Sequence, residues 1–233
     1  MKRYWLAISI ITLILGMATI PRVFLVPRLI QGLEDELSES LYAKQVQISV
    51  QAPLGWELLL GRIPGLDIVA AGAVVDGLGV ARVEVHGDQV RFDTQALWQD
   101  QEFVFVEAAN LWGEITVTEG ALNELFWKEV DPERSLSLRV SPQGIGVEGK
   151  ISVWNMEFTI TLRGDLEVLH GSALRFVLKN LEVQETRIPP ILLELLSEEF
   201  NFAIDFGAFP YPVELTEVQL AEQQIKVLFG GLQ

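Results

Sequence analysis

Histidine, cysteine and serine carry most nucleophilic and acid–base chemistry in proteins, and this chain offers few of them in useful patterns. The two histidines, His86 and His170, each precede a glycine, which predicts solvated turn residues. No serine lies in a G-x-S-x-G motif, and the chain contains no cysteine. The H-E-x-x-H pattern of zinc enzymes is also absent. We therefore predict a protein that is not an enzyme and that has no metal site and no cofactor.

Two weaker motifs also receive a structural interpretation. Gly144, Gly146 and Gly149 have a spacing close to that of a phosphate-binding loop. They lie inside a predicted hairpin rather than between a strand and a helix, where such a loop must stand to bind phosphate. The adjacent pair Glu198-Glu199 is expected on an acidic chain and is predicted to lie on a solvated helix face. Neither motif predicts a nucleotide site or a hydrolase.

The charge of the chain narrows the class of partner. Its 233 residues include 17 basic and 32 acidic side chains, for a net charge of −15. This balance argues against nucleic acid, whose phosphates would repel the protein. It also argues against adhesion to anionic lipids through a basic patch. Hydrophobic residues make up 49% of the chain, so any lipid contact is expected to rest on apolar surface.

The N-terminal segment has the composition of a membrane anchor. Lys2 and Arg3 precede Tyr4–Ile20, which is apolar except for one serine and two threonines. At about 1.5 Å per residue, this run is at the short end for a helix that spans a bilayer. We favour an uncleaved anchor over residues 1–26, with a cleaved signal peptide as the alternative because Gly16 and Ala18 resemble a cleavage site. The basic head predicts that the body, residues 27–233, lies on the extracytoplasmic side.

Leu29–Tyr42 is predicted to be an amphipathic helix. With a rotation of about 100° per residue, five apolar side chains fall within an arc of roughly 120°, namely Leu29, Ile30, Leu33, Leu37 and Leu41. Acidic residues between Glu34 and Glu39 cover most of the remaining surface, which places Glu36 on the predicted solvent flank. Two interpretations follow: an ordinary helix packed on a sheet, or a helix lying in a curved sheet whose interior also holds lipid.

The remaining sequence predicts a mostly antiparallel α+β domain with about three helices and no internal linker. An antiparallel meander is expected from Ser135 to Gln184, and a final hairpin from Val213 to Phe229. The other predicted elements are strands at Lys44–Ala52, Leu66–Val75 and Phe103–Val117, a hairpin with its turn at Gly87-Asp88, a short helix at Thr94–Trp98, a helix capped by Thr118 and a helix at Ile191–Phe200.

Several predicted strands are apolar on both faces. Leu66–Val75, Phe103–Val106 and Ile151–Ile160 carry apolar residues at successive positions rather than at alternate ones. A strand of this kind in a small α+β domain needs a second cover, such as another layer, a partner or a ligand. Core packing is one explanation. The other is a concave sheet that shares its apolar surface between the helix and acyl chains.

Four segments, in order along the chain, resemble one known family. The stretch Asn110–Leu125, which reads NLWGEITVTEGALNEL, resembles a strand-to-helix segment of the LmeA-like phospholipid-binding family of bacterial cell envelopes. Leu58–Arg62, Gly144–Gly164 and Leu181–Pro210 resemble further parts of the same family. The resemblance implies an exported or membrane-anchored protein that binds phospholipid. It also implies similarity to the tubular lipid-binding superfamily, in which a long helix packs in a highly curved antiparallel sheet.

These observations lead to one functional hypothesis and one alternative. The hypothesis is a phospholipid-binding protein tethered to a bacterial membrane, with lipid transfer or envelope maintenance as its role. The alternative is an envelope assembly module that binds a protein partner through an apolar face. The resemblance supplies no lipid contacts, so the candidate lining residues rest on pattern alone: Leu33, Leu37, Phe103, Phe105, Trp154, Phe158, Phe202 and Phe206.

Overall fold

The computed structural model describes residues 23–53, 55–100, 102–153, 156–169, 171–183, 186–187, 203–209 and 214–230. The chain forms two compact units. Unit 1 comprises Met1–Ala70, Glu84–Trp112 and Gly231–Gln233, and unit 2 comprises Ala71–Val83 and Gly113–Gly230. The strands β2 (Arg62–Val75), β3 (Leu78–Phe92) and β5 (Asn110–Thr118) contribute residues to both units.

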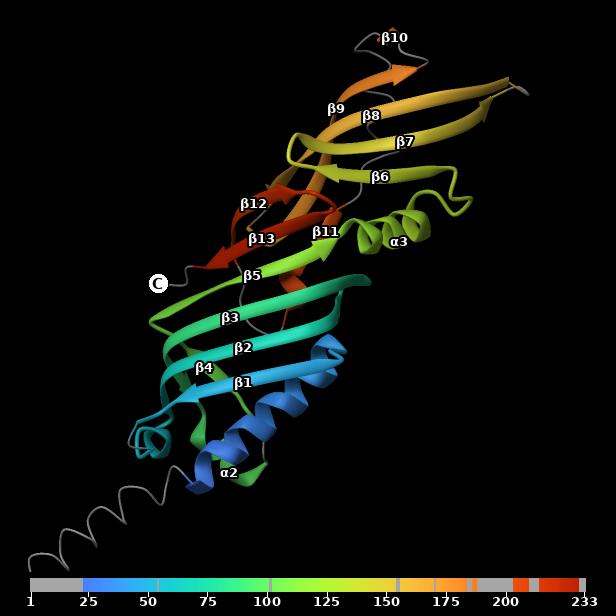
Figure 1. Ribbon diagram of the computed structural model, residues 1–233. Helices are drawn as coiled ribbons and strands as arrows, with labels where there is room; N and C mark the ends of the chain where they lie inside the picture. The colour runs from blue at the N-terminus through green and yellow to red at the C-terminus, as the bar shows by residue number, and fades with distance from the viewer. Residues whose placement is uncertain are drawn as a thin grey trace, which may run out of the picture. The chain divides into compact units, whose positions relative to one another are not determined.

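Unit 1 combines a long helix with one end of an antiparallel sheet (Figure 1). Its strands follow the order β1-β2-β3-β5, and β4 also pairs with β3. The elements that belong to unit 1 alone are the N-terminal helix over residues 23–41, β1 (Gln45–Gln51), the 3₁₀ turn η1 (Leu58–Leu60), α2 (Thr94–Gln99) and β4 (Phe105–Glu107). Asp93 caps α2, because its carboxylate accepts hydrogen bonds from the backbone N–H groups of Gln95 and Ala96.

Unit 2 contains a second sheet in the order β10-β9-β8-β7-β6, with β11 paired to β9. In the first sheet, β13 joins β5 and β12 joins β13. The helices and strands that belong to unit 2 alone have these bounds: α3 (Glu119–Glu129), β6 (Leu136–Ser141), β7 (Gly144–Val153), β8 (Met156–Leu169), β9 (Ala173–Val183), β10 (Thr186–Arg187), β11 (Ala203–Asp205), η2 (Phe206–Ala208), β12 (Leu215–Ala221) and β13 (Gln224–Gly230). The buried residues Leu138, Val147 and Leu162 are in register across β6, β7 and β8 and form part of the core.

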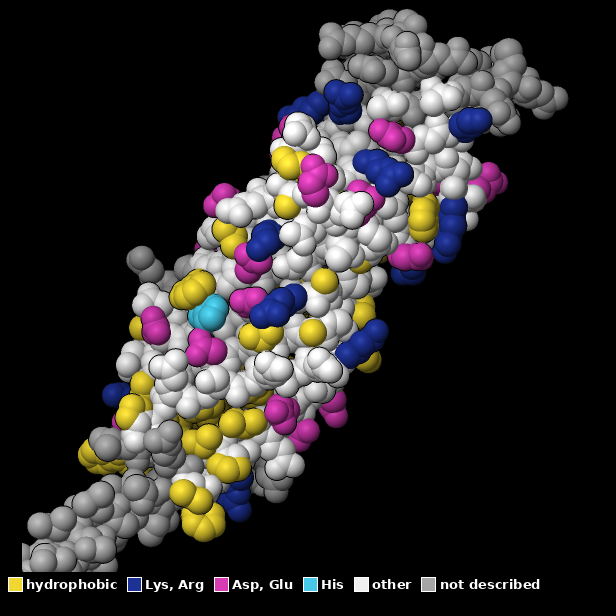
Figure 2. Space-filling view, in the orientation of Figure 1, with side chains coloured by type: hydrophobic (Ala, Val, Ile, Leu, Met, Phe, Trp, Pro, Cys, Tyr) yellow, Lys and Arg dark blue, Asp and Glu magenta, His cyan; other side chains and the backbone are white. Residues whose placement is uncertain are grey.

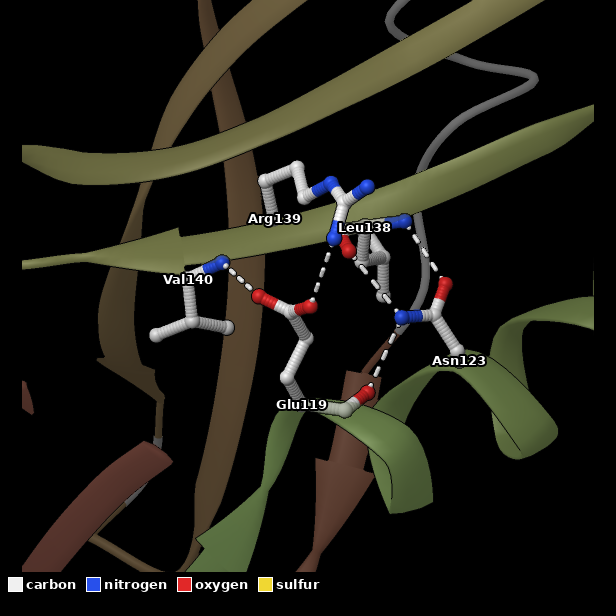
Figure 3. Close-up of polar contacts among 5 residues, drawn as sticks. All are labelled: Glu119, Asn123, Leu138, Arg139 and Val140. Atoms are coloured by element: carbon white, nitrogen blue, oxygen red, sulfur yellow. Dashed lines mark hydrogen bonds and ion pairs between the residues drawn. The ribbon is translucent and has the colours of Figure 1, made fainter. Parts of the chain in front are cut away.

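Helix α3 covers the free edge of β6, as Figure 3 shows. The side chain of Asn123 bonds the backbone of Leu138 twice, accepting from its N–H at 2.7 Å and donating to its C=O at 3.0 Å. Glu119 accepts from the N–H of Val140 at 2.8 Å and pairs with Arg139 at 3.2 Å. Side chains from the helix therefore replace the neighbouring strand that an edge lacks.

The backbone groups at the start of β6 are hydrogen-bonded to side chains in the same way. The indole N–H of Trp127 donates to the C=O of Leu136, and the carboxylate of Asp131 accepts from the N–H of Leu136 at 2.7 Å. Thr118 caps α3 as predicted, because its hydroxyl oxygen accepts from the N–H of Ala121 at 3.3 Å. Hydrogen bonds at Leu136, Leu138 and Val140 thereby hold the capped helix against β6.

Several sequence predictions match the structure. The predicted meander corresponds to β6 through β9, the final hairpin to β12 and β13, and the first strand to β1. The predicted strand Phe103–Val117 is interrupted and consists of β4 and β5. The predicted helix Ile191–Phe200 lies outside the described residues.

The hairpin predicted at Gly87-Asp88 is wrong, because β3 runs without a break from Leu78 to Phe92. The backbone absorbs the irregularity inside the strand, where Gln89 has φ of 50°. The turn lies instead at Asp76-Gly77, between β2 and β3, where φ is 49° and 77°. A two-residue hairpin favours left-handed conformations at both central residues, and Asp-Gly is among the pairs that adopt them most readily.

Candidate functional site

The N-terminal helix presents a continuous buried stripe to unit 1. Leu29, Leu33, Leu37 and Leu41 are each at most 1% exposed, and Leu25 extends the stripe by one turn. These residues follow one another at four-residue spacing, which places them on one face of a helix. The predicted apolar stripe is therefore confirmed for these leucines, while Ile30 at its margin is half-buried.

The predicted lining residues of unit 1 lie in or beside its core. Leu33 and Leu37 are buried in the helix stripe. Phe103 is buried, and its ring lies 5.7 Å from the ring of Phe92 in a tilted arrangement. Phe105 on β4 is half-buried. The structure thus brings four of the eight candidates into one unit, and their contact with lipid stays a prediction.

The other four candidates are not part of unit 1 as described. Phe206 is fully buried in unit 2, at the start of η2. Phe158 lies on β8, and nothing is described of its side chain. Trp154 and Phe202 lie outside the described residues. A single lining formed by all eight residues therefore stays a prediction.

The strand expected to be apolar on two faces has one buried face. On β2, Ile63, Leu66, Ile68 and Ala70 are buried, while the intervening side chains are half-buried or exposed. β1 differs, because its apolar side chains are only half-buried: Val46, Ile48 and Val50. The structure therefore leaves incompletely covered apolar surface on β1, which is the end strand of its sheet.

Glu36 departs from the prediction that it lies on the solvent flank of the helix. Its side chain is half-buried, and its Oε2 atom is buried with no hydrogen-bond partner among the described residues. Burial, together with the nearby carboxylate of Glu102, raises the pKa of Glu36 from 4.5 to about 7. Near neutral pH this carboxyl therefore keeps its proton more readily than an ordinary glutamate does, which lowers the charge beside the apolar stripe.

His86 is also not the solvated turn residue that the sequence predicts. It lies within β3, and its Nδ1 atom is 2.7 Å from a carboxylate oxygen of Asp67 on β2. Its ring stacks on Trp112 of β5, with the ring centroids 4.1 Å apart and the planes at 23°. The other oxygen of Asp67 accepts a hydrogen bond from Gln51 at 3.1 Å. Three strands of unit 1 thus assemble a polar cluster.

This cluster borders an open cavity of about 260 Å³ in unit 1. The lining residues are Gln51, Pro53, Pro64, Gly65, Leu66, Asp67, His86, Gly87, Asp88 and Trp112. An Asp–His pair can orient a base, but this lining contains no serine, threonine, cysteine or lysine to act as a nucleophile. Across the described residues, no group of three or more His, Asp or Glu side chains is placed to hold a metal ion.

Unit 2 has a larger open groove of about 630 Å³ on the outer face of its second sheet. Arg139 and Arg163 flank Gly146 there, since the register pairs Gly146 with both. Arg139 forms an ion pair with Glu119, and Lys179 forms one with Glu167. Because neighbouring carboxylates pair with two of its three cations, the groove has little net attraction for an anion.

The fold and the buried helix stripe define an α+β protein with a curled antiparallel sheet and an amphipathic N-terminal helix. The chain belongs to the LmeA-like phospholipid-binding family, whose model matches residues 24–229. This family is described by the ligand it binds rather than by a reaction. Neither the curated proteins nor the solved structures include a significant match. Within the described part of the chain, no helix is long and apolar enough to cross a membrane.

Proposed function

We propose that this chain is a membrane-tethered protein that holds phospholipid acyl chains on the extracytoplasmic side of a bacterial membrane. The observation that carries the proposal is the family match over residues 24–229, nearly the whole chain after the N-terminal segment. In this proposal residues 1–26 form the tether and residues 27–233 form the lipid-binding body. Transfer of lipid or maintenance of the envelope is its role.

The proposed acyl site lies in unit 1, beside the N-terminal helix, with Leu33, Leu37, Phe103 and Phe105 in its lining. The incompletely covered apolar face of β1 supports this location, because an acyl chain there would complete its burial. Each methylene removed from water contributes about 0.8 kcal/mol, so part of one chain suffices for useful affinity without charged contacts. This mode of binding is compatible with the net charge of −15.

The arrangement we propose is that of the tubular lipid-binding proteins, with the helix lying in a curved sheet. The buried leucine stripe supports it, since the whole inner face of the helix is covered within unit 1. The candidates outside unit 1, namely Trp154, Phe158, Phe202 and Phe206, remain proposed lipid contacts of their own segments.

The test fills the proposed site without disturbing the core. Ile48→Trp adds bulk on the half-buried apolar face of β1, and Gln47→Trp adds the same bulk at the neighbouring exposed position. We expect purified wild-type protein to carry phospholipid in native mass spectrometry, or to acquire it from phosphatidylcholine vesicles. Ile48→Trp should reduce the lipid-bound fraction several-fold, whereas Gln47→Trp should leave it unchanged.

Two results would contradict the proposal. One is a folded wild-type chain that emerges from purification without lipid and remains lipid-free after incubation with vesicles. The other is an equal lipid-bound fraction in both tryptophan variants, which would place the acyl chain away from β1. Retention of a protein instead of lipid would support the alternative of an envelope assembly module.

A further inference from the structure

One end of unit 1 is covered by large apolar side chains that are exposed to solvent. Its members come from the start of the N-terminal helix, from η1 and the turn that precedes it, and from α2: Val23, Phe24, Trp56, Leu59, Leu60 and Trp98. We name this set the apolar end. Leu60 is 69% exposed, Phe24 is 68% exposed and Trp56 is 57% exposed. Figure 2 shows hydrophobic side chains gathered where Figure 1 draws the N-terminal helix and α2.

Contacts within unit 1 place these elements next to one another. η1 packs against α2, and the guanidinium of Arg28 lies over the ring of Trp98, 5.4 Å from its centroid. Phe24 precedes Arg28 by four residues on the helix, so the two side chains share a face. The backbone N–H of Leu59 bonds the C=O of Trp56 at 3.1 Å. The apolar end is therefore one surface rather than scattered residues.

We infer that the apolar end inserts into the interfacial layer of a lipid bilayer and so holds unit 1 on the membrane surface. Tryptophan and arginine beside aliphatic side chains are the composition that favours the boundary between head groups and acyl chains. Exposed apolar patches on proteins commonly mark a binding surface for protein or membrane. This inference rests on the proposed function, to which it adds the surface that meets the lipid source.

Two features favour a lipid surface over a protein partner. The apolar sequence Tyr4–Ile20 ends three positions before Val23, the first residue of the apolar end, so the chain continues from this surface into a segment suited to the bilayer. The net charge of −15 disfavours attraction of the body to anionic lipid. Insertion through apolar side chains requires no such charge and should occur on zwitterionic lipid.

Because the chain has no cysteine, single nitroxide labels can test the inference in the full-length protein. Leu60→Cys and Leu59→Cys place the label on the apolar end, and Glu39→Cys places it on an exposed position near the other end of the N-terminal helix. The protein is reconstituted into vesicles of phosphatidylcholine, and collisions of each label with oxygen and with a water-soluble nickel chelate are measured. We expect the oxygen-to-nickel collision ratio at residues 59 and 60 to exceed that at residue 39 several-fold.

Each other outcome overturns the inference. Equal ratios at positions 60 and 39 would mean that the tether holds the body without contact by the apolar end. A label at residue 60 that is immobilised and shielded from both reagents would mean that a second copy of the chain covers this surface. Native mass spectrometry of the unlabelled protein tests the proposed function separately. Bound lipid with a water-exposed residue 60 refutes the membrane contact alone, and an inserted residue 60 without bound lipid refutes the lipid carrier alone.

Discussion

The amide of Asn123 pairs with the backbone of Leu138 as a neighbouring strand would, accepting from the N–H at 2.7 Å and donating to the C=O at 3.0 Å. Both groups belong to the edge of β6, the last strand of its sheet. Asn123 is a buried polar residue, and its amide also donates to the C=O of Glu119 at 3.0 Å. A helix side chain thus closes a sheet edge that would otherwise leave backbone groups unpaired.

We predict that Asn123→Ala lowers the free energy of unfolding by about 2–4 kcal/mol, because it leaves the buried N–H and C=O of Leu138 without partners. Urea titration of the protein in detergent micelles measures this change. Glu124→Ala is the matched control, since Glu124 is exposed on the same helix and forms an ion pair with exposed Arg134. A loss of less than about 0.5 kcal/mol for Asn123→Ala would mean that water or another group replaces the amide.

The same relationship explains part of the family motif. The stretch Asn110–Leu125 carries the resemblance, and it contains both Glu119 and Asn123. These two residues are four apart on α3, so they share a face and reach successive outward positions of β6. The polar positions within this motif therefore have a structural role in unit 2, independent of any lipid contact.

We predict that Leu33→Ala lowers the free energy of unfolding by about 2–5 kcal/mol, because Leu33 is completely buried in the helix stripe. The lipid-bound fraction should fall with it if the helix lines the proposed site. Glu34→Ala, at the exposed adjacent position, should change neither quantity. If Leu33→Ala lowers stability but the protein that remains folded binds as much lipid as wild type, Leu33 belongs to the core and not to the lining.

The local spacing of apolar residues was sufficient to predict helices and strands whose pattern lies within one continuous segment. The four-residue spacing of leucines predicts the buried face of the N-terminal helix, and alternation predicts β1. Contacts between distant segments were not predictable in this way. The pairing of Asp67 with His86 depends on β2 and β3 lying side by side, and the turn that allows it is Asp76-Gly77 rather than Gly87-Asp88. Asp-Gly is the stronger signal for a two-residue turn, but both pairs lie between strand-like segments, and the prediction chose the wrong pair.

The candidate site was predictable to a similar extent. The pattern identified Leu33, Leu37 and Phe103 as apolar residues of one body, and all three are buried in unit 1. It did not predict that Glu36 would be half-buried, because burial depends on which distant segments pack beside the helix. Burial is the main cause of the raised pKa of Glu36, and the second cause, the carboxylate of Glu102, is also distant in sequence. It also could not locate the apolar end, because exposure depends on which apolar side chains the fold leaves uncovered.

We predict that the cluster around His86 has no part in lipid binding. His86 and Asp67 are about a third exposed, and a partly exposed pair of this kind contributes about 0–1 kcal/mol to stability. His86→Ala should therefore leave the lipid-bound fraction unchanged and shift the unfolding midpoint only slightly. A several-fold decrease in bound lipid at unchanged stability would instead identify the cavity beside Trp112 as part of the lipid site.

Glu36 makes the stability of unit 1 depend on pH. Its pKa is about 7 in the folded chain and 4.5 ordinarily, so the folded state binds the proton more tightly than the unfolded state. The resulting stability is fully present below pH 4.5 and is lost as the pH rises through 7. The difference in pKa corresponds to about 3 kcal/mol, which we reduce to about 1–2 kcal/mol because solvent reaches part of the side chain.

We therefore predict that Glu36→Gln raises the free energy of unfolding by about 1–2 kcal/mol at pH 8 and leaves it nearly unchanged at pH 4.5. Glu102→Gln should produce a smaller change in the same direction, because its carboxylate is the second cause of the shift. Glu34→Gln, at an exposed position of the same helix, should give the same difference from wild type at both pH values. Urea titrations at the two pH values measure all three, and a pH-independent effect of Glu36→Gln would mean that Glu36 is ionised normally in the folded protein.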